Sequence, residues 1–183
     1  DYNGLTFAET FGDMAFTLYS HAVSLRDLGC TQSPMNAWIT LNGVETLPLR
    51  MERHVENAQK VAGFLQQHPS VEWVSYAGLS SSPYYQLAQK YLQGKAGSVF
   101  TFGIRGGYES GLRLLEKVEL FSHVSNIGDS RSLILHPAST THRQLSDEQR
   151  LTAGAGPEVI RLSVGIESAE DLIADLEQAL EGL

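Results

Sequence analysis

The clearest hydrophobic pattern of the chain lies near its carboxyl end. From Ile160 to Glu167, apolar and polar residues alternate, which is typical of a strand with one buried face. Gly165 ends this run, and Ser168 with Asp171 then forms a capping-box pattern ahead of a helix. Apolar residues follow at helical spacing: Leu172, Ile173, Leu176, Ala179 and Leu180. The pattern predicts a strand that turns directly into an amphipathic helix.

This strand carries an arginine, Arg161, near its start. A guanidinium does not lose its charge, so on an apolar strand it needs an anionic partner or a route to solvent. Two interpretations are open at this point: a structural contact with an internal carboxylate or water, or the binding of an anionic ligand. The strand alone favours the structural interpretation, because charge pairs in proteins are often structural.

The rest of the chain alternates helical and strand patterns. A helix closed by Gly29 is expected over 11–28, and Ser33 with Pro34 has the residue types of a helix start. Because proline removes a backbone donor, Pro48 is expected to kink or interrupt the helix that begins at Ser33 and Pro34. Later helices are expected at 84–92 and 108–117, and strands at 71–76, 98–104, 132–135 and 159–163. Such interleaving predicts an α/β fold, a small sheet with helices on one face.

Composition restricts the classes of function. A hydrophobic content of 42% is enough for a core, and no apolar run approaches the ~20 residues that cross a bilayer. A net charge of −8, from 21 acidic and 13 basic residues, argues against a nucleic-acid partner. The single cysteine, Cys30, excludes an internal disulfide. We expect a soluble, cytoplasmic protein without a membrane partner.

Three histidines, His123, His136 and His142, lie near one another in the sequence. No acidic or cysteine residues accompany them at the spacing of a metal site. We therefore expect structural or substrate-loop roles for them, and no metal site. Arg131, in the same region, is expected to be solvated or paired in a salt bridge.

Four stretches carry a further pattern: residues 33–37, 43–54, 123–145 and 161–167. In matching order over nearly the whole chain, they resemble the carboxyl-terminal region of the Cys/Met-metabolism family of pyridoxal-phosphate enzymes. The run from Asn126 to Asp129, with a basic residue before Ser132, resembles the O-acetylhomoserine sulfhydrylase form. The resemblance implies the carboxyl-terminal domain of an aspartate-aminotransferase-like, fold type I enzyme with a mostly antiparallel sheet. Residues 1–48 would be a helical arm from a pyridoxal-phosphate-binding domain, and residues 49–183 the small domain.

Members of this family hold the cofactor as a Schiff base on a lysine in a Ser-x-Thr-Lys context, upstream of the matched region. None of the lysines of this chain has that context: Lys60, Lys90, Lys95 and Lys117. We expect all four to be surface residues. The chain is thus interpreted as a carboxyl-terminal fragment of a longer enzyme, without cofactor-binding or catalytic residues of its own and inactive alone.

The resemblance also implies roles for three residues. Arg161 would bind the α-carboxylate of an amino-acid substrate, because its planar fork meets a carboxylate with two parallel hydrogen bonds. Ser125 and Asn126 would belong to the loop that reaches the same carboxylate. The full-length enzyme would use pyridoxal phosphate as its electron sink to make homocysteine and acetate from O-acetyl-L-homoserine and sulfide. Family members are usually homo-oligomers, here a tetramer.

Two alternatives stay open. The full-length protein could be a methionine or cystathionine γ-lyase, or a γ-synthase, of the same family. From the residues alone, an acidic α/β domain with one buried arginine could also be a non-catalytic module that binds a small molecule. These residues do not determine whether the acceptor is sulfide or a thiol. They also do not determine whether the donor is the O-acetyl or the O-succinyl compound.

Overall fold

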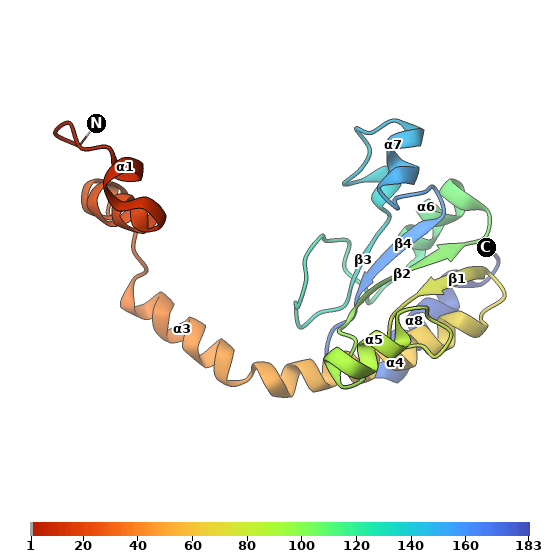
Figure 1. The fold of residues 1–183 in the computed structure, drawn as a ribbon. Helices are drawn as coiled ribbons and strands as arrows, with labels where there is room; N and C mark the ends of the chain where they lie inside the picture. Colours follow the sequence, from red (N-terminus) through yellow and green to blue (C-terminus); the bar gives the residue numbers. More distant parts are fainter. Residues whose placement is uncertain (1) are drawn as a thin grey trace. The chain divides into compact units, whose positions relative to one another are not determined.

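A computed structural model describes residues 2–183 and divides the chain into two compact units, which separate between Thr46 and Leu47 (Figure 1). The first unit is helical: α1 (Phe7–Phe11), a 3-10 turn (Gly12–Met14), α2 (Ala15–Tyr19), a π-helical segment (Ser20–Leu28) and α3 (Pro34–Glu45). The second has α4 (Leu47–Gln67), β1 (Val71–Ser75), α5 (Tyr85–Leu92), β2 (Val99–Ile104), α6 (Gly107–Lys117), β3 (Leu133–Leu135), a 3-10 turn (Pro137–Ser139), α7 (Asp147–Thr152), β4 (Val159–Ser163) and α8 (Ala169–Leu180).

The first unit has the helix start and stop that its sequence predicts. Gly29 ends the helical run at φ 66°, where its N–H donates to the Leu25 carbonyl. The Ser33 hydroxyl accepts the Asn36 N–H at 3.2 Å and caps α3. The expected helix 11–28 is divided, however, into a 3-10 turn, an α-helix and a π-helical segment. In place of a core, the aromatic rings of Tyr2, Phe11 and Tyr19 gather around Phe7.

The break between the two units confirms the expected effect of Pro48. The helical run stops at Glu45 and resumes at Leu47, so the interruption at Thr46 precedes the proline. Pro48 is then the second residue of α4, where a missing N–H costs no intrahelical hydrogen bond. That the residues before position 49 connect to a cofactor-binding domain stays a prediction.

The sheet of the second unit has the strand order β1-β2-β4-β3, and all neighbouring strands are antiparallel. β4 is therefore an inner strand, hydrogen-bonded to β2 on one side and β3 on the other. In register, Thr101 of β2 and Leu135 of β3 lie opposite Arg161 of β4. The architecture confirms the predicted α/β fold with an antiparallel sheet.

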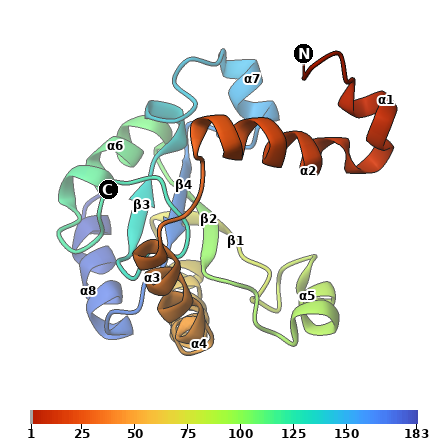
Figure 2. The ribbon, with the colours of Figure 1, turned by 90° about the vertical axis from the view of Figure 1, so that its left-hand side faces the viewer.

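Helices α4, α6 and α8 cover one face of this sheet (Figure 2). The residues of β4 that face them, Ile160 and Leu162, have no exposed surface. Fully burying one such side chain stabilises the fold by about 1.5–3 kcal/mol. Because side chains alternate along a strand, Arg161 lies on the opposite face of the sheet from this core. In residues 2–183 no helix is long and apolar enough to cross a membrane.

Candidate functional site

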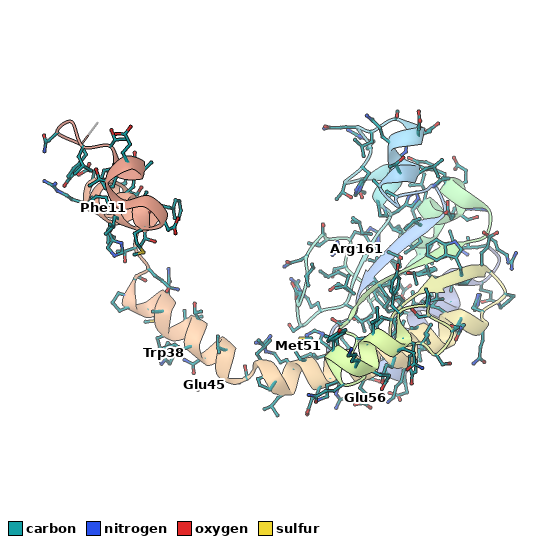
Figure 3. The ribbon with its side chains drawn as sticks, viewed as in Figure 1. Phe11, Trp38, Glu45, Met51, Glu56 and Arg161 are labelled. Carbon is teal, nitrogen blue, oxygen red and sulfur yellow. The ribbon has the colours of Figure 1, made fainter. Side chains whose placement is uncertain are left out.

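Arg161 meets both of its predicted neighbours. Its Nη1 donates to the Ser125 hydroxyl oxygen at 3.5 Å, and its Nη2 donates to the Asn126 carbonyl oxygen at 3.4 Å. Ser125 and Asn126 lie on the loop between α6 and β3, some 35 residues earlier in the chain. Figure 3 shows Arg161 on β4, beside this loop. The structure thus brings the three candidate residues together on the face of the sheet opposite the core.

Arg161 is half-buried as a residue, its guanidinium makes exposed hydrogen bonds, and it has no internal counter-ion in the part of the chain that the structure describes. Both of its contacts are with neutral oxygens, at the long end of hydrogen-bond distances. A guanidinium has five N–H donors in a fixed fork, so these two contacts leave donors for an incoming anion. The geometry therefore disfavours the interpretation in which Arg161 holds a carboxylate of its own domain.

The loop that carries Ser125 and Asn126, residues 123–131, is exposed over most of its length. Inside it, the Asn126 side chain accepts the Ile127 N–H at 2.8 Å. The Arg131 guanidinium contacts Asp129 at 3.4 Å, and the Arg131 N–H donates to the same carboxylate at 3.0 Å. The backbone N–H and guanidinium of Arg131 hold the pKa of Asp129 below its usual value. Arg131 is thus the salt-bridged residue that we expected.

The base of this loop is fixed to the end of β4 by Glu167, a residue that the sequence analysis did not single out. Its Oε1 accepts the Ser132 N–H at 2.6 Å, and its Oε2 accepts the Ser132 hydroxyl at 2.9 Å. Ser132 Oγ in turn accepts the Gly165 N–H at 2.7 Å. The Ile166 N–H donates to the Ser130 carbonyl at 2.9 Å. We call Ser130, Ser132, Gly165, Ile166 and Glu167 the loop base.

Two buried polar residues of α4 fix the same segment from the core side. The His54 ring nitrogen Nδ1 contacts the Val164 carbonyl oxygen at 2.6 Å, so it carries the proton and donates. The Asn57 side-chain amide donates to the carbonyl oxygens of Gly165 at 3.0 Å and Glu167 at 2.8 Å. Both side chains are fully buried. Sequence reasoning missed this pair, because the carbonyl groups that they contact lie 108 to 110 residues away in the sequence.

Asp175 of α8 fixes the chain just before the loop. Its carboxylate accepts the N–H groups of Glu119, Leu120 and Phe121, at 2.8, 2.9 and 3.2 Å. Its Oδ1 also accepts the Gln178 side-chain amide at 3.1 Å. Asp175 is only 8% exposed, so these bonds are sheltered from water. The segment that enters the loop is therefore attached to α8.

The histidines show no metal geometry. His136 is fully buried, with its two ring nitrogens 3.0 Å from the Ser139 hydroxyl and 2.9 Å from the Pro157 carbonyl. Burial lowers the pKa of His136 by disfavouring its charged form. Within residues 2–183, no three histidine, cysteine, aspartate or glutamate side chains gather closely enough to hold a metal ion. The geometry gives His136 a structural role.

The lysines are all exposed, as expected. Their contacts lie at the protein surface: Lys60 with Glu56, Lys95 with Glu52, Lys90 over the Tyr91 ring and Lys117 with the Glu181 carbonyl. A Schiff-base lysine must be held where it meets the cofactor, and none of these four has such a setting. That Arg161 binds the carboxylate of a substrate stays a prediction.

The chain is similar in sequence and in structure to known proteins. The chain is 50% identical over 179 residues to O-acetyl-L-homoserine sulfhydrylase 1 of Thermus thermophilus, covering 98% of this chain and 42% of that relative. Homocysteine synthase of Schizosaccharomyces pombe is 45% identical, with the same coverages. A crystal structure from Campylobacter jejuni, assigned as an O-acetylhomoserine (thiol)-lyase with a pyridoxyl-lysine phosphate, superposes with a TM-score of 0.82. It is 46% identical, over 91% of this chain and 40% of that one. The chain therefore spans less than half the length of these relatives. The model of the Cys/Met metabolism PLP-dependent enzymes matches residues 7–181, and the chain belongs to this family.

Proposed function

We propose that this chain is the carboxyl-terminal part of a pyridoxal-phosphate-dependent O-acetylhomoserine sulfhydrylase. The complete enzyme makes homocysteine and acetate from O-acetyl-L-homoserine and sulfide. Relatives that carry these activities in their names match nearly the whole chain at 45–50% identity. The single observation that supports the role of this part is the half-buried Arg161, held by Ser125 and Asn126 and without a counter-ion among residues 2–183.

In this proposal Arg161 binds the α-carboxylate of the substrate. Its planar fork accommodates both carboxylate oxygens, which fixes the direction of the bonds at Cα. Ser125 and Asn126 contact separate nitrogens of the guanidinium and so restrict its rotation. Pyridoxal phosphate, bound by a lysine outside this chain, supplies the electron sink. The contribution of this chain is orientation, which is a substantial part of catalysis when reactants must be aligned.

The reaction is tested by measuring homocysteine and 2-oxobutyrate with O-acetyl-L-homoserine and sulfide as substrates. We expect homocysteine to dominate. The motivation is the loop sequence from Asn126 to Arg131, which resembles the sulfhydrylase form. Dominant 2-oxobutyrate would assign the enzyme to the γ-lyases instead.

We further propose that the enzyme is a cytoplasmic homo-oligomer, a tetramer. Light scattering on the purified protein tests the number of subunits.

The role of Arg161 is tested by Arg161→Lys in the complete enzyme. Lysine keeps the charge but loses the fork, so one charge-assisted hydrogen bond of ~1.5–3 kcal/mol disappears. We expect kcat/KM for O-acetyl-L-homoserine to fall by about one to two orders of magnitude or more, with an unchanged melting temperature. Arg131→Lys, on an exposed arginine paired with Asp129, is the matched control and should leave the kinetics intact. Near-normal kinetics in Arg161→Lys, or parallel losses of stability and activity, would contradict this role.

A further inference from the structure

The two parts of the candidate carboxylate site come from segments far apart in the chain. Arg161 lies on β4, an inner strand that hydrogen bonds fix on both sides. Ser125 and Asn126 lie on the exposed loop 123–131, and both are themselves exposed. The position of such a loop is set by its two ends. The contacts at the loop base therefore decide where these two residues meet the guanidinium.

Glu167 makes the strongest of those contacts. Its two carboxylate oxygens accept the N–H and the hydroxyl of the same residue, Ser132, which directly follows the loop. Hydrogen bonds to a charged acceptor are shorter and about twice as strong as neutral ones. In the described part of the chain no lysine, arginine or histidine forms an ion pair with Glu167, so the Ser132 N–H and hydroxyl are the protein groups that contact its carboxylate.

Gly165 allows the loop end and the end of β4 to approach this closely. A Cβ atom at Gly165 would overlap the Ser130 carbonyl oxygen and the Glu167 carboxylate. The Gly165 N–H donates a hydrogen bond to the Ser132 hydroxyl oxygen, and the same hydroxyl donates a hydrogen bond to the Glu167 carboxylate. The hydroxyl of Ser132 thus links the backbone of β4's end to the Glu167 carboxylate. The loop base is a closed set of hydrogen bonds.

We propose that Glu167 is a positioning residue of the substrate-carboxylate site, and this rests on the proposed role of Arg161. By holding Ser132, Glu167 fixes the end of the loop. The loop then places Ser125 and Asn126 against the Arg161 guanidinium. Without the Glu167 carboxylate the loop end loses two of the hydrogen bonds that hold it against the end of β4. The loop then shifts, and the two contacts that limit the rotation of the guanidinium weaken. Glu167 itself touches no substrate atom in this scheme.

The test measures how strongly the enzyme depends on the substrate carboxylate. In the complete holoenzyme, kcat/KM is measured for O-acetyl-L-homoserine and for its α-carboxamide, which lacks the carboxylate charge. The ratio is kcat/KM for O-acetyl-L-homoserine divided by kcat/KM for the carboxamide. We expect Glu167→Ala to reduce this ratio by about tenfold or more, the loss associated with a charge-assisted hydrogen bond. Glu167→Gln keeps the size and one acceptor, so its ratio should fall less. A purely structural role would lower both rate constants together and leave the ratio unchanged.

Two further variants separate the possible outcomes. Glu170→Gln removes an exposed carboxylate three residues away and should keep the wild-type ratio. Arg161→Lys should reduce the ratio at least as much as Glu167→Ala. A wild-type ratio in both Glu167 variants, with a reduced ratio in Arg161→Lys, overturns the positioning role alone. A wild-type ratio in Arg161→Lys overturns the carboxylate site itself. If Glu167→Ala does not fold, Glu167→Gln decides: a wild-type ratio there overturns the proposal.

Discussion

Replacing Asp175 by asparagine removes a hydrogen-bond acceptor where the structure concentrates donors. Oδ2 of Asp175 accepts the N–H groups of Leu120 and Phe121, and Oδ1 accepts those of Glu119 and the Gln178 side chain. Asparagine keeps one oxygen and presents an NH₂ group in place of the other. In either orientation of the amide, two donors lose their acceptor and face another donor.

The cost follows from those two lost bonds. A hydrogen bond to a charged group is worth about 1.5–3 kcal/mol, which gives an upper range of roughly 3–6 kcal/mol for two. Asp175 is 8% exposed, so water relieves part of the loss. We expect the free energy of unfolding to fall by about 2–4 kcal/mol, on the scale of a buried polar group left unpaired.

Urea denaturation of the 183-residue chain, followed by circular dichroism, measures this change as a shift of the midpoint at constant m value. Asp171→Asn is the matched control, because it makes the same substitution on an exposed residue in the first turn of α8. That control should cost only about 0.3–1 kcal/mol, from the lost interaction of a negative charge with the helix dipole. Equal destabilisation by the two substitutions would refute the argument.

Three other predictions concern pH and close packing. Burial raises the pKa of Tyr76 to about 12 from 10.0, so stability should fall as pH rises from 10 to 12, by about 1.4 kcal/mol per pH unit. Urea titrations at several pH values should show this slope in the wild type but not in Tyr76→Phe. The pKa of His136 is lowered below 6.5 by burial, so stability should fall as pH drops below 6.5, and His136→Gln should flatten that slope. Gly165→Ala should destabilise by about 1–3 kcal/mol through overlap with Ser130, measured by urea midpoints against Gly63→Ala, which meets no atom within 4 Å.

The local elements could be predicted from the sequence because their signals are local. β4 and α8 lie where the alternation and the helical spacing indicate, and the Ser168 hydroxyl accepts the Asp171 N–H as the capping pattern predicts. The helix over 11–28 was less regular than expected, since periodicity does not distinguish α from π winding. The interruption expected at Pro48 lies two residues earlier, at Thr46, because a proline fits the start of a helix.

The candidate site was only partly predictable. The meeting of Arg161 with Ser125 and Asn126 came from family resemblance, because alternation alone does not say which face of a strand meets which loop. Glu167 is one of 21 acidic residues, and its sequence neighbours do not reveal that it accepts two hydrogen bonds from Ser132. His54 is likewise distinguished only by a contact 110 residues away. Hydrogen bonds between residues far apart in the chain produce no periodic pattern in the sequence from which they could be predicted.

The inner position of β4 has a consequence for enzyme engineering. A residue whose backbone pairs with strands on both sides cannot shift without breaking both ladders, so Arg161 is a fixed anchor. The neighbouring loop 123–131 is exposed and joins the fold mainly at its ends. A library that varies residues 123, 124, 127 and 128 while retaining Ser125, Asn126 and Asp129 to Ser132 would therefore sample new substrate side chains around the proposed carboxylate anchor. Selection for altered donors should accumulate substitutions in that loop and spare the strand.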